Sequence, residues 1–166
     1  NDTDTLTLCD GQGTAVPAQV RALDRWPDDS IRWLLVNWVA KASADDHGFT
    51  LAIDTNGRAE AGTSIRERRY LSTWKGSEAL CIDVGCARFI VDKTGSFPLT
   101  SAVVSDAEML ASTGLTCTLA SPVTIDTLMV IDDGSVSTLV EAEGRVGPLK
   151  IVHRFRFHAG MSLVQI

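Results

Sequence analysis

The segment RALDRWPDDSIRWLLVNWVA, residues 21–40, holds three of the chain's four tryptophans. As an extended strand, its second half is apolar on both faces. One face carries Ile31, Trp33, Leu35, Asn37 and Val39, and the other carries Arg32, Leu34, Val36 and Trp38, so both are largely apolar. A strand with two apolar faces is typical of the interior of a β protein rather than of its edge. The pattern predicts Trp33 and Trp38 in the core, where truncating a large aromatic costs about 3–5 kcal/mol.

The residues before that strand, Trp26-Pro27-Asp28-Asp29-Ser30, predict a tight turn. Proline presets φ at the second position of a turn, and Asp accepts the bridge or left-handed region that follows. We expect the Ser30 hydroxyl to form a hydrogen bond inside the turn, because Ser and Asp commonly bond nearby backbone groups. Trp26, Pro27 and Asp28 would then shape the turn that leads into the central strand.

Short apolar runs separated by turn residues fill the rest of the chain, and CDGQG and DDGS carry the Asp-Gly hairpin signal. This texture predicts one all-β domain, residues 1–166: a barrel or sandwich of about ten or more mostly antiparallel strands. Two segments differ from this pattern. Residues 107–113 resemble a helical turn, and the polar stretch 58–79 could form a loop or a short helix. The expected strands are 5–9, 16–23, 31–39, 49–54, 79–83, 87–92, 99–104, 115–119, 123–131, 135–143, 149–157 and 162–166.

The charge and the chain ends bear on partners. With a net charge of −6 and a pI of about 4.9, the chain would repel phosphate backbones, so we expect no nucleic acid partner. No apolar run reaches the length of a membrane-spanning helix, and we expect no membrane partner. The sequence opens with NDTDTL and closes with the strand-like GMSLVQI. We expect a segment of a larger protein, or a barrel whose terminal strand a neighbour supplies.

The sequence carries no recognisable catalytic or metal-binding motif, so we predict no catalytic residue, metal or cofactor. The cysteines at 9, 81, 86 and 117 lack the spacing of a zinc site. We favour buried thiols over a disulfide framework for them, with a single bridge as the alternative for a secreted chain. The adjacent acidic pairs, such as Asp28 and Asp29, lie in predicted turns and point apart, whereas glycoside hydrolysis needs two facing carboxylates.

Carbohydrate binding needs exposed aromatic side chains, and Trp26 and Trp74 are the tryptophans with polar neighbours on both sides. The RERRY motif places Arg69 beside Tyr70, where an anionic sugar could bind. These four residues are the candidate carbohydrate-binding set. The alternatives are buried anchors for the two tryptophans and a solvated charged loop for the motif, and we favour these alternatives.

Several motifs together resemble the N-terminal RIFT-type β-barrel domain of rhamnogalacturonan exolyase-like proteins. They are Asp10-Gly11, Val16-Pro17-Ala18-Gln19, and Trp26-Pro27-Asp28-Asp29-Ser30 followed by Arg32 and Trp33. Downstream, IDVGCARFIVDKTGSFPLTSAVV and the last 27 residues look similar to later strands of the same domain. Asp29 stands where that family usually has Gly, so we expect an Asp in a strained or left-handed conformation.

The resemblance implies a non-catalytic β module of a secreted, extracellular or periplasmic, carbohydrate-active protein. It would pack against a catalytic domain that lies elsewhere in the protein and contact polysaccharide. The alternative is a structural subunit of an extracellular fibre or virion assembly, completed by a strand from a neighbouring subunit, because an incomplete sheet exposes an edge that invites strand addition. An enzyme in which the RERRY motif performs the chemistry is the least favoured reading.

Overall fold

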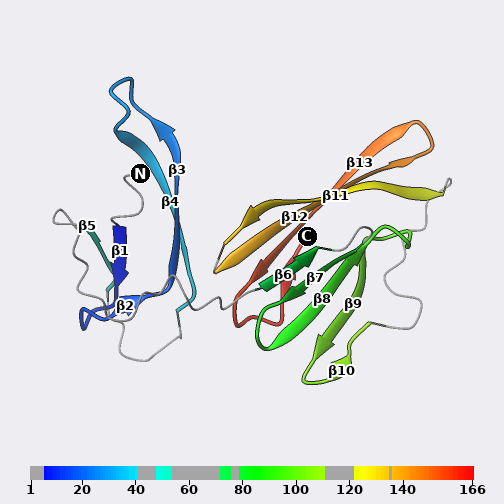
Figure 1. Ribbon diagram of the computed structural model, residues 1–166, viewed down its shortest axis with the longest axis horizontal. Coiled ribbons are helices and arrows are strands. Elements are labelled where there is room, and N and C mark those ends of the chain that lie inside the picture. The colour runs from blue at the N-terminus through cyan, green and yellow to red at the C-terminus, as the bar shows by residue number, and fades with distance from the viewer. Residues whose placement is uncertain (1–5, 41–47, 54–71, 76–78, 111–121, 135) are drawn as a thin grey trace. The chain divides into compact units, whose positions relative to one another are not determined.

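The computed structural model describes residues 6–40, 48–53, 72–75, 79–110, 122–134 and 136–166. Every secondary-structure element in these ranges is a β-strand, and every strand pairing is antiparallel. The all-β prediction is therefore confirmed (Figure 1). None of the four described sheets closes on itself. The chain divides into two compact units, Asn1–Arg69 and Tyr70–Ile166, which are described separately below. The assignment of residues 1–166 to a single domain stays a prediction.

The first unit contains two small sheets. In one, β1 (Leu6–Cys9) lies between β2 (Ala15–Val16) and β5 (Thr50–Ile53). The predicted Asp-Gly hairpin joins β1 to β2: the Asp10 carboxylate accepts the N–H groups of Gln12 and Thr14, and Gly13 adopts a φ of 78°. The other sheet is the long hairpin of β3 (Ala18–Arg25) and β4 (Ile31–Trp38). Leu8 is the one buried hydrophobic residue described in this unit.

The second unit is a sandwich of two sheets. The five-stranded sheet has the order β10-β9-β8-β7-β6, and the four-stranded sheet has the order β11-β12-β13-β14. The bounds are β6 Ser72–Lys75, β7 Ala79–Asp83, β8 Ala87–Asp92, β9 Leu99–Val104, β10 Ala107–Glu108, β11 Val123–Asp133, β12 Ser137–Val146, β13 Leu149–His158 and β14 Val164–Gln165. Two backbone hydrogen bonds fasten the segment after β13: Ala159 donates to the Val136 carbonyl and Gly160 to the Val84 carbonyl.

Side chains from both sheets form one core between them. Ile82, Val91, Val140, Phe155 and Phe157 are at most 1% exposed. Phe89 and Phe157 lie with ring centroids 5.1 Å apart. The expected strand 149–157 alternates: His153, Phe155 and Phe157 face the core side while Arg154 and Arg156 face outward. A buried aromatic of this size contributes about 3–5 kcal/mol when it is truncated.

Gly144 in β12 lies at a close approach of β12 to β11. It pairs with Ile125 of β11 next to a register shift between Ile125 and Thr127. A Cβ placed on Gly144 would overlap the carbonyl oxygen of Thr124 and lie 3.1 Å from Cα of Ile125. Only glycine fits there, because both obstacles are backbone atoms that cannot rotate away.

Most predicted strands are confirmed within two or three residues of their expected ends. Two predictions are wrong: Ala107–Glu108 is the short strand β10 rather than a helical turn, and Ser72–Lys75, inside the expected loop or helix, is the strand β6. The hairpin turn before β10 explains the first error, since Ser105 and Asp106 both take positive φ, as a two-residue hairpin requires. The predicted strand 115–119 lies outside the described residues.

The predicted core position of Trp33 and Trp38 is also wrong. Their side chains are 62% and 41% exposed. Among the described residues β4 pairs with β3 alone, and no described second layer buries either face of this hairpin. Within the described ranges, Leu34 to Asn37 of β4 are only half-buried, so the described strands do not supply the two covering layers that the sequence pattern indicates.

Candidate functional site: the β3–β4 hairpin

The turn between β3 and β4 has the geometry that its sequence predicts. The Trp26 N–H donates to the Ser30 carbonyl at 2.9 Å, and the Asp29 N–H donates to the Trp26 carbonyl at 2.9 Å. Pro27, Asp28 and Asp29 thus form a three-residue hairpin loop that ends in a left-handed residue. That residue is Asp29, with φ of 66°, as expected from the missing glycine.

The Asp28 carboxylate closes this loop from inside. It accepts the Ser30 hydroxyl at 2.6 Å and the Ser30 N–H at 3.1 Å, so the predicted role of the Ser30 hydroxyl is confirmed. These hydrogen bonds, chiefly that from the hydroxyl, lower the pKa of Asp28 below its usual value. On the outer side, the Arg25 guanidinium donates to the Asp29 carbonyl at 2.6 Å. The tip of the hairpin is therefore held by local polar contacts.

Trp26 carries a cation on its ring. The Arg32 guanidinium carbon lies 4.6 Å from the ring centroid, within cation–π range. An ion pair of 3.3 Å with Asp24 across the hairpin holds the Arg32 side chain in place. Trp26 itself remains 51% exposed. The cluster Trp26–Arg32–Asp24 thus presents an ordered aromatic ring and a guanidinium group at the surface.

Large apolar side chains continue along the hairpin below this cluster. Leu23, at a register shift in β3, is exposed, and so are Trp33 and Trp38 on β4. Trp38 also contacts the exposed Phe49, with ring centroids 5.6 Å apart. Because side chains alternate along a strand, Trp33 and Trp38 face opposite sides of β4, so the hairpin exposes large apolar groups on both faces.

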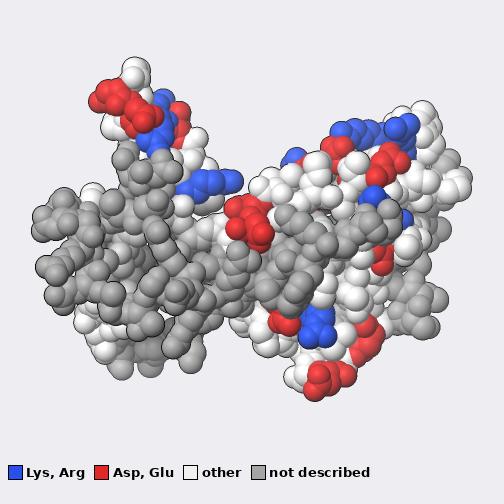
Figure 2. All heavy atoms as spheres, viewed as in Figure 1, with Lys and Arg blue, Asp and Glu red and all other residues white. Residues whose placement is uncertain are grey.

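The charges at the hairpin tip are mixed. Figure 2 shows acidic and basic side chains side by side over the free end of the β3–β4 hairpin, where Asp24, Asp28 and Asp29 alternate with Arg25 and Arg32 in the sequence. A surface with both signs does not select strongly for one ligand charge. The aromatic and apolar groups are therefore its distinguishing feature.

The other candidate residues lie apart from this cluster in the sequence. Trp74 belongs to β6 in the second unit, and Arg69 and Tyr70 lie outside the described residues. Sequence reasoning named Trp26 as a binding candidate but assigned no site role to Arg32 or Asp24. The hairpin register could have shown their proximity, because Asp24 pairs with Trp33, the neighbour of Arg32.

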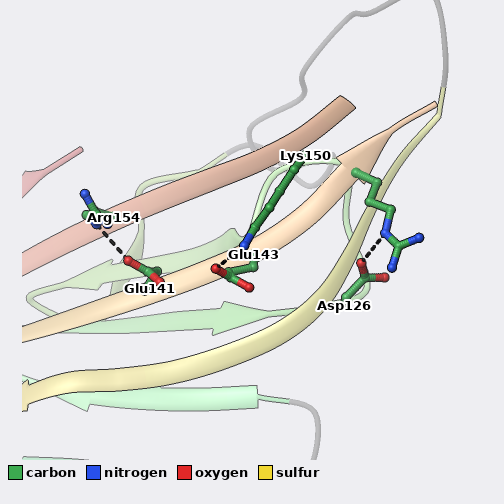
Figure 3. Close-up of polar contacts among 6 residues, drawn as sticks. Asp126, Glu141, Glu143, Lys150 and Arg154 are labelled. Carbon is green, nitrogen blue, oxygen red and sulfur yellow. Dashed lines mark hydrogen bonds and ion pairs between the residues drawn. The ribbon is translucent and has the colours of Figure 1, made fainter. Parts of the chain in front are cut away.

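The second unit offers a contrasting surface. On the outer face of β11, β12 and β13, ion pairs join Glu141 to Arg154, Glu143 to Lys150, and Asp126 to Arg145 (Figure 3). Glu141 and Arg154 are directly opposite in the register. Exposed pairs contribute only about 0–1 kcal/mol each. They fix the orientation of the charges on this face more than they stabilise the sandwich.

The described cysteines are free thiols, with Cys9 and Cys81 half-buried and Cys86 exposed. Burial, the largest influence, raises the pKa of the Cys81 thiol. The expectation of buried thiols is therefore wrong for Cys86, which lies in the β7–β8 turn. Cys117 lies outside the described residues.

In the described ranges no group of three or more His, Cys, Asp or Glu side chains is arranged to hold a metal ion. The same ranges contain no helix long and apolar enough to cross a membrane.

Comparison with known families adds to this geometry. Residues 1–54 match the family model of the PcRGLX-like N-terminal RIFT barrel domain. The matched segment, about a third of the chain, is thus similar to the RIFT barrel family. It contains β1 to β5, including the β3–β4 hairpin, and so confirms the resemblance carried by the motifs from Asp10 to Trp33. The similarity of the later segments to the same domain stays a prediction. A comparison with curated proteins found no match.

Proposed function

We propose that the chain is a non-catalytic β module of an extracellular carbohydrate-active protein related to rhamnogalacturonan lyases. Its role is to pack against a catalytic domain through the β3–β4 hairpin. The observation that carries this proposal is the exposure of Leu23, Trp33 and Trp38 on one hairpin. Aromatic side chains are enriched at protein interfaces. Removing their apolar surface from water in a contact is favourable and stabilises the complex.

Contact with polysaccharide is the second part of the proposal, and Trp26 supports it. Pyranose rings stack on exposed aromatic faces, and Trp26 remains half exposed although the Arg32 guanidinium, held by Asp24, lies over one face of its ring. A sugar would therefore stack on the opposite face. A guanidinium group held this way can donate hydrogen bonds to sugar hydroxyl or carboxylate oxygens. Trp26 at the tip and Trp33 on the strand thus serve two different contacts of the same hairpin.

The test of domain packing uses the affinity of this chain for the catalytic domain of the same protein, measured by calorimetry. We expect Trp33→Ser to weaken the affinity at least tenfold. Met109→Ser is the matched control, since Met109 has similar exposure, at 63%, but lies in the second unit. Equal loss in both variants, or none in Trp33→Ser, contradicts packing through the hairpin.

Polysaccharide contact is tested separately with rhamnogalacturonan oligosaccharides and the Trp26→Ala variant. We expect Trp26→Ala to lose oligosaccharide binding while its affinity for the catalytic domain stays within about twofold of the parent's. Unchanged oligosaccharide binding in Trp26→Ala removes this part of the proposal and leaves the packing role standing.

A further inference from the structure

The edge of β13 is the longest regular strand edge that the described residues of the sandwich leave open. β13, Leu149–His158, pairs with β12 along all ten residues without a register shift. On its other side, β14 pairs only with Arg156 and Phe157. In the described part of the chain, no strand covers the backbone of residues 149–154 on that side.

The remaining edges of the two sandwich sheets are protected in ways that β13 is not. β11 has two register shifts, and such bulges discourage the addition of another strand. β6 has four residues and β10 only two, which is too short to template much pairing. β13 is both long and regular, and β14 shows that its edge accepts an antiparallel strand.

The side chains of this open stretch indicate what kind of strand fits. On the core-facing side, Ile151 and His153 are half-buried, so an incoming strand would pack apolar side chains against them. On the outer side, Lys150 and Arg154 are paired with glutamates, yet their side chains remain 65% and 68% exposed (Figure 3). Both can therefore still meet carboxylates on an incoming strand.

A second copy of β13 is a poor occupant. An antiparallel pairing of two copies centred on Val152 would place Lys150 of one copy opposite Arg154 of the other. Like charges directly opposite each other destabilise a strand pair. Charge complementarity therefore favours a strand that carries acidic residues on its outer face.

We propose that residues 149–154 of β13 bind an extended segment of another protein by antiparallel strand addition. The segment has apolar residues facing the sandwich core and acidic residues facing Lys150 and Arg154. Backbone hydrogen bonds supply the affinity, and the alternating side chains supply the selectivity. This interaction is independent of the proposed function, which uses the hairpin of the other unit.

The probe is a fluorescein-labelled peptide, Glu-Val-Thr-Val-Glu-Val, whose glutamates would lie opposite Arg154 and Lys150. One control peptide has lysine in place of both glutamates, and a second has N-methylated alternate amides and cannot form a ladder. We expect the acidic peptide to bind at least tenfold more tightly than either control. We also expect it to slow hydrogen exchange at the amides of residues 149–154. Equal binding of the N-methylated peptide, or no protection of these amides, overturns the proposal.

Charge reversal tests the selectivity on the protein side. In Lys150→Glu/Arg154→Glu the preference should switch to the lysine peptide. Arg88→Glu is the matched control, because Arg88 is also exposed and paired with an aspartate but lies on the other sheet, and it should retain the original preference. If the double variant does not fold, Arg154→Gln should reduce the preference for the acidic peptide several-fold. An unchanged preference in Arg154→Gln contradicts the proposal.

Discussion

Replacing Gly144 by alanine probes the strand approach on which the sandwich depends. The added Cβ would overlap the Thr124 carbonyl oxygen and lie 3.0 Å from the Thr124 carbonyl carbon. Because the obstacles are backbone atoms, β11 must move away from β12. Overpacking of this kind costs about 1–3 kcal/mol. Weakening the ladder hydrogen bonds beside Gly144 adds about 1 kcal/mol for each bond lost. With two such bonds lost, we expect a total of about 3–5 kcal/mol.

For a unit of this size, a loss of 3 kcal/mol lowers Tm by at least about 12 °C. Thermal melting followed by circular dichroism measures this shift, and hydrogen exchange of β11 and β12 locates it. Gly160→Ala is the control: its Cβ meets nothing within 4 Å, and its φ of 71° alone carries a penalty, which is about 1–2 kcal/mol. A Gly144→Ala melt as mild as that of Gly160→Ala would refute the close approach of β11 to Gly144.

Three further predictions concern single groups. Asp29→Gly should raise the free energy of unfolding in urea by up to about 1 kcal/mol, because glycine adopts the φ of 66° without strain; a decrease would show that the ion pair of 3.6 Å between the Asp29 carboxylate and Arg25 matters more. Thr138→Val should also stabilise the protein, by about 1 kcal/mol, because the fully buried Thr138 hydroxyl has no hydrogen-bond partner among the described residues; a destabilised variant would contradict this assignment. Burial lowers the pKa of His153, so the unfolded chain takes up a proton that the folded chain resists. Stability should therefore fall as pH drops through the unfolded value of about 6.5, and His153→Leu should reduce that slope in urea titrations from pH 8 to pH 5.

The sequence predicts the sandwich strands well because one face of each strand is buried. In β13, alternation places Phe155 and Phe157 inward and Arg154 outward, and the structure agrees. The hairpin turn is equally predictable, since Pro27, Asp28 and Ser30 each have a local conformational role. Even the left-handed Asp29 follows from its position in the motif.

The tryptophans of β4 show where sequence reasoning ends. Two apolar faces indicate that a strand will be covered, but they do not indicate which part of the protein, or which partner, covers it. Arg32 was overlooked as a site residue for a related reason. Its contacts with Trp26 and Asp24 depend on the register of the hairpin. That register includes a shift between Ala22 and Asp24, which the turn motif does not predict.

The free energy of unfolding of Trp33→Ala, measured in this chain alone by urea titration, tests the central claim most directly. If Trp33 is an exposed contact residue awaiting a partner, the substitution should cost less than about 1 kcal/mol, as surface changes usually do. A loss of about 3–5 kcal/mol, the cost of truncating a core aromatic, would contradict the account and place Trp33 in a closed core.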